Sequence, residues 1–228
     1  MPTTEQAPRR IPSGDRAAGK RKAILKAATD AFLREGYGVG MDTIAAEAGV
    51  AKVTVYNHFG SKEALFTAIV GEILERALAE STHLIEERLG SSTDVRADLT
   101  AICEAWVAGH ATPEVLTLHN VVMGSMPRLP DLGRTWRELG PDRFHVVVRT
   151  ALGELVERGE LAIDDVPLAA MQLSGLVLLP HIAYGSAGAV PDADLTARLI
   201  TGGVDMFLAR YGPTAASRPD VAPGPPGA

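Results

Sequence analysis

Apolar residues recur at spacings of three and four along most of the chain, while strict alternation of apolar and polar residues is scarce. Spacing of this kind places apolar side chains on one face of an α-helix, whereas alternation is typical of β-strands. Glycine or proline interrupts the pattern at intervals that suit helices of ordinary length. The sequence therefore predicts an all-α fold.

The N-terminal part of the chain is predicted to form three helices and then a fourth, longer one. Gly36 supplies a left-handed stop for the first helix, and Gly49 turns the chain between the second and the third. The hydroxyl of Ser61 is the expected N-cap of the fourth. The predicted helices cover residues 16–35, 41–48, 52–59 and 62–89.

Five more helices are predicted in the rest of the chain. Thr112, Asp165 and Asp192 each stand at the start of a run of helical spacing, where an oxygen-bearing side chain and negative charge are favourable. Proline follows closely at two of these starts, as expected for a first turn that needs no N–H group. The predicted helices cover residues 93–110, 113–125, 131–158, 167–185 and 192–211.

The two ends of the chain lack a pattern that could bury an apolar face. Residues 1–15 contain Arg9 and Arg10 but no apolar run of the kind a signal peptide needs, so we expect a disordered basic arm. Residues 213–228 are rich in proline, alanine and glycine without periodicity, so we expect a disordered tail.

Charge is divided unequally along the chain, although the overall net charge is −6. Residues 1–62 carry 10 Lys and Arg against 6 Asp and Glu, a net charge of +4, whereas residues 63–228 carry 12 against 22, a net charge of −10. All five lysines lie in the first block. An acidic protein is ordinarily repelled by nucleic acid, but this division leaves a cationic N-terminal part that suits a polyanionic partner.

A stretch without formal charge, residues 166–190, is long enough to cross a membrane. Gln172, Ser174 and His181 lie within it and no basic residue flanks it, so a helix buried against protein is favoured over a transmembrane span. The single cysteine, Cys103, permits no intrachain disulfide and fits a reducing compartment, and we expect a cytoplasmic protein.

Residues 41–66 carry the most informative motif, a short helix followed by a glycine turn and a second short helix. Apolar residues at helical spacing, from Ile44 to Phe59, would lock the two helices together and leave the other face of the second helix exposed. That face carries side chains suited to base edges and phosphates: Lys52, Val53, Thr54, Tyr56, Asn57 and His58. The same pattern also fits a plain helical hairpin with a polar outer face.

These residues resemble the DNA-binding domain of TetR-type transcriptional regulators. The resemblance is carried by Gly36-Tyr37, Ile44-Ala45, Ala48-Gly49-Val50, the run from Thr54 to Phe59, and Ser61-Lys62-Glu63 with Leu65. It implies an N-terminal three-helix helix-turn-helix domain over residues 16–62 and a larger helical effector-binding and dimerisation domain over residues 63–212. It also implies a homodimer that binds a palindromic double-stranded operator.

The resemblance implies two kinds of DNA contact. Thr54 corresponds to a position that contacts a base or a phosphate, and Tyr56, His58 and Lys62 correspond to positions that contact phosphate. The variable positions that select the DNA sequence correspond to Lys52, Val53 and Asn57.

Three residues depart from the family pattern. Ala51 stands where a serine or threonine cap is common, Val53 where glycine is frequent, and Gly40 where a hydroxyl residue often starts the helix. Loss of a capping hydroxyl costs about 1 kcal/mol of local helix stability. We therefore expect the scaffold to hold with fewer phosphate contacts.

A second resemblance covers the larger domain. Pro130-Asp131-Leu132, Gly140-Pro141 and the runs from Glu157 to Leu161 and from Ile163 to Ala170 are similar to the C-terminal domain of AefR-like members of that family. The resemblance implies that the last two long helices pair with their copies in a homodimer. A helix that is apolar all round needs such cover. The expected interface residues are Leu173, Leu176, Val177, Leu179, Tyr184, Leu199 and Phe207.

Aromatic, histidine and methionine side chains of the larger domain are candidates for an apolar effector pocket with a few polar groups. They are Trp106, His110, His119, Met123, Trp136, Phe144, His145 and Met171. Each of them also fits an ordinary core or surface position.

No cofactor, metal or catalytic site is predicted. The histidines form no short ligand pair on one helical turn. The stretch 14–21 imitates a phosphate-binding loop, but Arg21 replaces the hydroxyl that binds magnesium and no apolar strand precedes it. No serine stands in a nucleophile elbow and no catalytic motif surrounds Cys103, so an enzyme is not expected.

The sequence thus predicts a cytoplasmic, homodimeric DNA-binding regulator, a repressor that a small apolar or amphipathic molecule releases from its operator. The alternative is a helical small-molecule carrier or interaction protein whose helix-turn-helix head is only structural. The basic residues at the N-terminus fit either a DNA-contacting arm or a solvated tail. They are Arg9, Arg10, Arg16, Lys20, Arg21 and Lys22.

Overall fold

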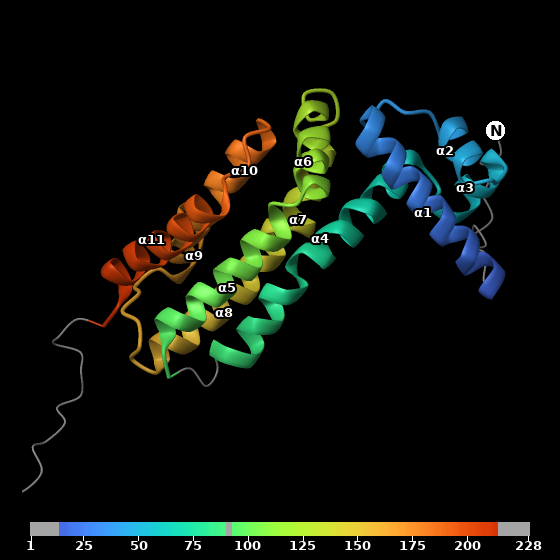
Figure 1. Cartoon of the computed structure of the whole chain (residues 1–228). Helices are drawn as coiled ribbons and strands as arrows, with labels where there is room; N and C mark the ends of the chain where they lie inside the picture. Colours follow the sequence, from blue (N-terminus) through green and yellow to red (C-terminus); the bar gives the residue numbers. More distant parts are fainter. Residues whose placement is uncertain (1–13, 90–92, 214–228) are drawn as a thin grey trace, which may run out of the picture. The chain divides into compact units, whose positions relative to one another are not determined.

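The computed structural model describes residues 14–89 and 93–213. Within these ranges the chain forms eleven α-helices and no β-strand, which confirms the predicted all-α fold (Figure 1). The helices are α1 (Asp15–Glu35), α2 (Met41–Glu47), α3 (Lys52–Phe59), α4 (Lys62–Arg88), α5 (Val95–His110), α6 (Pro113–Ser125), α7 (Pro130–Leu139), α8 (Pro141–Glu157), α9 (Val166–Val177), α10 (Leu179–Ser186) and α11 (Ala193–Tyr211). The predicted arm and tail fall almost entirely on residues 1–13 and 214–228, which lie outside the described residues.

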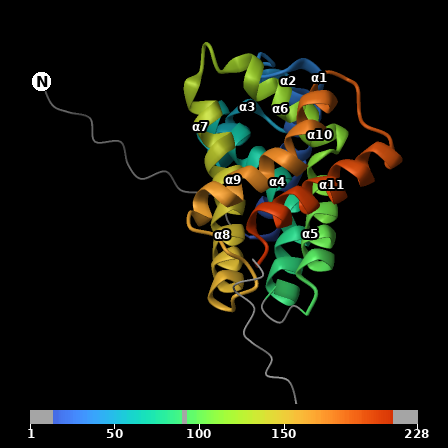
Figure 2. The ribbon, with the colours of Figure 1, turned by 90° about the vertical axis from the view of Figure 1, so that its left-hand side faces the viewer.

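The helices belong to two compact units. The first unit contains α1–α3, the part of α4 up to Arg76, and the pair α6 and α7. The second unit contains α4 from Ala77, together with α5 and α8–α11. In the first unit α2 packs against both α1 and α3, and in the second α11 packs against α5 and α9. Figure 2 shows α9, α10 and α11 side by side on one face of the second unit.

Each unit has its own apolar core, formed by side chains at helical spacing. In the first unit the completely buried side chains of the three N-terminal helices are Ile24, Ala28, Ala31, Phe32, Ile44 and Val55. In the second unit one cluster of buried residues runs from Leu78 to Tyr211 and draws on every helix there except α10. Burial of such faces is the main favourable contribution to folding, because it removes apolar surface from water.

One stretch predicted as a single helix, residues 131–158, is instead two, and this corrects the prediction. Gly140 separates α7 from α8, and Pro141 opens α8. Proline has no N–H group to continue the helical hydrogen bonds, and it disfavours helical conformation in the residue before it. Gly140 accordingly has φ −115° and ψ −93°, outside the helical region.

The stretch 167–185 is also two helices rather than the predicted one. Pro180 stands in the first turn of α10, and α9 and α10 meet at an angle of 44°. Among the described residues no single helix is long and apolar enough to cross a membrane. Only the bent pair of α9 and α10, taken together, has the length and the apolar composition of a possible span. The other predicted helix ends agree with the structure within two residues, and α3 and α6 have the predicted bounds.

Candidate nucleic-acid interface

The pair α2 and α3 forms a helix-turn-helix held together from the inside. Gly49 in the turn has φ +65°, in the left-handed region that favours glycine. Its N–H group donates a hydrogen bond to the carbonyl oxygen of Ala46 at 3.1 Å. Ile44 of α2 and Val55 of α3 are completely buried, so the opposite face of α3 has a fixed direction.

The six side chains of α3 that were predicted to meet DNA all lie outside the core. Lys52, Val53 and Asn57 are exposed, and Thr54, Tyr56 and His58 are half-buried. At 63%, the side chain of Val53 is the most exposed large apolar side chain among the described residues. Ala51 at the N-cap makes no side-chain cap hydrogen bond. The structure therefore presents one short helix face with donors, acceptors and one methyl-bearing side chain.

An acidic residue on α2, Asp42, forms an ion pair with Lys52, the lysine of α3. The Nζ atom of Lys52 donates a hydrogen bond to Oδ2 of Asp42 at 2.8 Å, and this partner raises the pKa of Lys52. Both side chains are at least half exposed, so water screens the attraction and phosphate can compete for the lysine. The sequence analysis did not identify Asp42, because nothing in the local pattern pairs residues ten positions apart across a turn.

Basic residues of α1 lie beside the C-terminal end of α3. The guanidinium carbon of Arg21 lies 5.3 Å from the centroid of the Phe59 ring. Burial, and then the positive charges of Lys20 and Arg21, lower the pKa of His58. Arg16, Lys20 and Lys22 are exposed, whereas Arg9 and Arg10 lie outside the described residues. The cationic part of α1 thus adjoins the face that α3 presents.

The remaining predicted DNA contact, Lys62, lies half-buried at the start of α4. Its Nζ atom is 4.7 Å from the centroid of the Tyr37 ring. Burial lowers the pKa of Lys62, while the carboxylate of Glu63 acts in the opposite direction. Sequence spacing did not reveal the contact between Lys62 and the Tyr37 ring, because the two residues are far apart along the chain.

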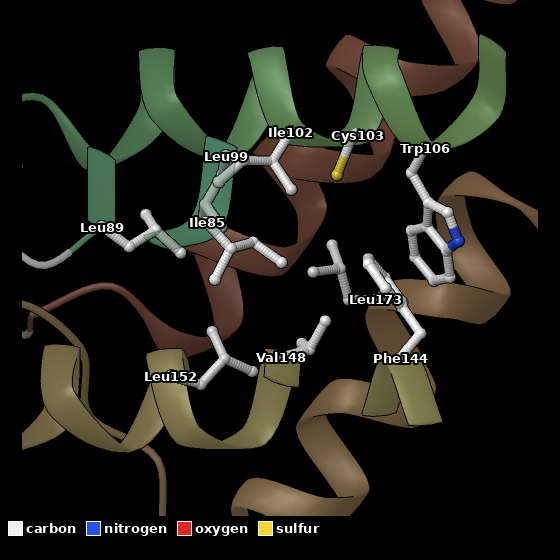
Figure 3. Close-up of a pocket in the computed structure, with 10 residues that line it drawn as sticks. All are labelled: Ile85, Leu89, Leu99, Ile102, Cys103, Trp106, Phe144, Val148, Leu152 and Leu173. Carbon is white, nitrogen blue, oxygen red and sulfur yellow. The ribbon is translucent and has the colours of Figure 1, made fainter. Parts of the chain in front are cut away.

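Three of the predicted pocket residues meet inside the second unit. The Trp106 ring centroid lies 4.3 Å from that of Phe144 and 6.2 Å from that of His110, and all three side chains are buried. Trp106 and Phe144 stand at one end of a narrow apolar cavity of about 10 Å³, drawn in Figure 3. Its other walls are Ile85, Leu89, Leu99, Ile102, Cys103, Val148, Leu152 and Leu173. A space of this size holds about one water molecule.

Two buried nitrogen atoms of the described residues have no hydrogen-bond partner, Nε1 of Trp106 and Nε2 of His181. The indole N–H group can only donate. Nδ1 of His181 lies 2.9 Å from the carbonyl oxygen of Val177, which can only accept, so this nitrogen donates. An unpaired buried polar group costs about 1–3 kcal/mol, which a partner brought by a ligand would recover.

His110 and the other five predicted pocket residues do not line this cavity. In the first unit the rings of His119 and Trp136 pack together with centroids 5.4 Å apart, and Met123 is exposed. In the second unit His145 forms a hydrogen bond with a serine of α9, and Met171 is 62% exposed. Across residues 14–89 and 93–213, no group of three or more His, Cys, Asp or Glu side chains could hold a metal ion.

The predicted dimer residues divide between the interior and the surface of the second unit. Leu173, Val177 and Phe207 are buried within their own chain, so their side chains are not available at a surface. Leu176 and Leu199 are half-buried, and Leu179 and Tyr184 are exposed. The sequence analysis missed three further exposed apolar side chains on α9 and α11: Leu168, Leu195 and Met206.

Two family profiles match the chain in consecutive segments. Residues 24–69 match the profile of bacterial regulatory proteins of the TetR family. Residues 97–213, just over half of the chain, match the profile of the C-terminal domain of AefR-like transcriptional repressors.

Individual proteins show the same similarity. A crystal structure of a TetR-family transcriptional regulator from Mesorhizobium loti superimposes with a TM-score of 0.79 at 30% identity, over 87% of this chain and 100% of that one. The HTH-type transcriptional activator FasR of Mycolicibacterium smegmatis is 34% identical over 112 residues, 46% of this chain and 49% of FasR. The HTH-type transcriptional regulator RutR of Escherichia coli is 44% identical over 63 residues, 27% of this chain and 30% of RutR. The matched part thus spans half or less of the curated relatives' length.

Asp42 provides a test of how the exposed face of α3 meets DNA. Replacing Asp42 with Asn removes a negative charge from the interface and releases Lys52, so affinity for duplex DNA should rise and its salt dependence should steepen. Fluorescence anisotropy with a labelled duplex at several salt concentrations measures both. Glu114→Gln is the matched control, because it also breaks an ion pair, with Arg76, but one that does not involve α3. Weaker DNA binding by Asp42→Asn would contradict this assignment.

His110 provides a test of the interior of the second unit. Burial lowers the pKa of His110 from 6.5 to about 4, so between these values the unfolded chain binds a proton that the folded chain does not. Stability should therefore fall as pH drops from 6.5 to 4, by at most about 3.5 kcal/mol at about 1.4 kcal/mol per pKa unit. Urea unfolding should show a flatter pH dependence for His110→Gln than for the wild type. The exposed His83→Gln control should keep the wild-type slope, and equal slopes for all three proteins would refute the prediction.

Proposed function

Because the chain belongs to the TetR family of DNA-binding transcriptional regulators and carries an AefR-like C-terminal domain, we propose that it is a homodimeric repressor released from a palindromic operator by a small apolar effector. Membership of this family confirms the predicted DNA-binding regulator, as opposed to an enzyme, and leaves the carrier hypothesis without support. The observation that carries the proposal is the exposed face of α3 beside the cationic part of α1.

Exposed apolar side chains on α9, α10 and α11 support the homodimer. Met171, Leu179, Tyr184 and Met206 are each between 58% and 62% exposed, and they lie on helices that stand side by side (Figure 2). Apolar side chains gathered on neighbouring helices mark an interaction surface more often than scattered ones do. A twofold axis would bring the same face of two copies together and bury it. Twofold symmetry in turn explains a palindromic operator.

The cavity beside Trp106 supports an effector that is largely apolar. Its walls are aliphatic and aromatic side chains together with a thiol, and burial raises the pKa of that Cys103 thiol to about 12, so it is uncharged. Among the wall residues, Nε1 of Trp106 is the one buried side-chain polar atom without a hydrogen-bond partner, and Figure 3 shows it on the edge of the indole ring that points away from the other wall residues. We therefore expect an uncharged, apolar or amphipathic effector.

The small size of the cavity indicates how such an effector would act. A volume of about 10 Å³ is far below that of any organic effector, so the effector must move side chains and helices of the second unit apart. It shifts the protein toward a DNA-incompetent state only to the extent that it binds that state more tightly. The helix α4 contributes residues to both units, which makes it the candidate to transmit the change.

The direction of regulation rests on the C-terminal profile. That profile describes AefR-like repressors, whereas FasR is named as an activator. We propose repression because the profile matches the larger part of the chain. A DNA-binding protein of this kind acts in the bacterial cytoplasm, where the chromosome lies.

Selection of DNA fragments by the purified full chain tests the proposal. Genomic fragments captured at moderate salt should contain an inverted repeat whose half-sites lie about 10 base pairs apart, centre to centre, or a multiple of that. Asn57→Ala should capture a wider range of sequences, because it removes a side chain at a sequence-selecting position. A reporter gene placed behind the selected site should be expressed less when the protein is present.

Three outcomes would contradict separate parts of the proposal. Fragments without any shared sequence would refute operator recognition. A protein that stays monomeric on the selected site would refute the homodimer. Higher reporter expression in the presence of the protein would refute repression and favour activation.

A further inference from the structure

Lys62 stands where a positive charge is unfavourable. It is the first residue of α4, and the N-terminal end of a helix carries a partial positive charge that repels cations. Burial also lowers its pKa. Within residues 14–89 and 93–213, no carboxylate forms an ion pair with its ammonium group. Apart from the attraction of the neighbouring Glu63 carboxylate, which raises the pKa of Lys62, the ammonium group therefore needs another source of stabilisation.

The ring of Tyr37 supplies that stabilisation. The Nζ atom of Lys62 lies 4.7 Å from the ring centroid, within the range over which the negative face of an aromatic ring attracts a cation. A contact through one face leaves N–H donors of the ammonium group pointing away from the ring. Those donors remain available to a phosphate group.

Aromatic neighbours hold the Tyr37 ring in place. It stacks on Phe32 with centroids 5.9 Å apart and planes inclined by 14°. Phe66 of α4 meets it edge-on at 5.1 Å and 90°. Phe32 and Phe66 are completely buried and packed in the core, so their rings have little freedom to move and they restrict the Tyr37 ring that packs on them. The ring is therefore a fixed platform rather than a mobile surface group.

The hydroxyl group of Tyr37 adds a second restraint. It donates a hydrogen bond to Oε1 of Glu63 at 3.2 Å. The backbone N–H group of Glu63 and the hydroxyl of Ser61 also donate to this carboxylate, and together these bonds hold its pKa below the usual value. Glu63 is thus an ionised cap of α4, tied down by three donors beside Lys62 without pairing with it.

We propose that Tyr37 is the positioning residue for Lys62: its ring holds the ammonium group at the start of α4 in the place from which it binds a DNA phosphate. The inference rests on the proposed DNA contact of Lys62. Without the ring, the lysine side chain would sample many rotamers and would turn toward Glu63. Ordering it in advance lowers the entropy lost when phosphate binds.

Variants of the full chain that change only the ring separate this role from packing. Tyr37→Phe keeps the ring and loses the hydroxyl. Pentafluorophenylalanine at the same position keeps the ring shape and removes its negative face. Each variant at position 37 is prepared with lysine and with alanine at position 62. The affinity of each protein for a labelled duplex of arbitrary sequence is then measured at several salt concentrations.

Tyr37→Phe should bind DNA nearly as the wild type does, because Phe32 and Phe66 still hold the ring when the hydrogen bond to Glu63 is lost. The pentafluoro variant should bind about two- to fivefold more weakly when Lys62 is present, which is the fold-change of a partly exposed cation–π contact. In the Lys62→Ala background both rings should bind equally. Lys62→Ala itself should reduce the slope of log affinity against log salt by about 0.9, as for one phosphate contact. The proposal would be overturned if the pentafluoro variant also bound DNA more weakly in the Lys62→Ala background. It would likewise be overturned if the pentafluoro variant bound DNA as tightly as Tyr37→Phe when Lys62 is present.

Proton NMR of the free protein keeps this test separate from the proposed function. The ε-methylene protons of Lys62 lie near the ring face, so they should resonate upfield in the wild type and in Tyr37→Phe. A normal chemical shift in both proteins would overturn the inference even if DNA binds. If the wild type binds no duplex at all, the proposed function fails, while the upfield shift still reports whether Tyr37 holds the ammonium group.

Discussion

The packing of one short helix is the constraint on which the rest of the structure depends. The helix α3 has eight residues, and a helix of that length does not persist in water without tertiary contacts. Its only completely buried side chain, Val55, fixes it against α2, which in turn packs against α1. Because that inner side is fixed, Lys52, Val53 and Asn57 face solvent in a defined arrangement. A recognition helix needs side chains in a defined arrangement to fit a major groove.

Electrostatic control of this face comes from neighbouring elements rather than from α3 itself. Asp42 on α2 holds Lys52, and Tyr37 before α2 holds Lys62. Burial, and then the positive charges of Lys20 and Arg21 on α1, lower the pKa of His58. Lys52 and Lys62 are therefore already restricted by neighbouring side chains before DNA is present. The net charge of −10 on residues 63–228 would keep the remainder of the chain away from phosphate.

Local signals in the sequence were sufficient to predict the positions of most helices and to identify α3 as the helix with an exposed polar face. Glycine stops and caps act within a few residues, so the bounds of α3 and α6 were predicted correctly. The breaks at Pro141 and Pro180 were missed because apolar spacing continues across each proline. Contacts between distant residues gave no signal, and so the partners Asp42 and Tyr37 were not found. Composition could select Trp106 and Phe144 as pocket candidates, but it could not separate them from Trp136, which belongs to the other unit. It also could not tell that Phe207 faces inward while Met206 faces outward.

Cleavage of bound DNA by an iron chelate tethered to the protein tests most directly whether the outer face of α3 lies in a groove. The native Cys103 is completely buried, so a thiol introduced on the surface would be the reactive one. Chelate attached through Asn57→Cys should cut the duplex at positions that face the major groove of each half-site, whereas chelate attached through Glu87→Cys on α4 should cut little or nothing. Equal cutting from both positions, or none from position 57 while the protein remains bound, would contradict the account.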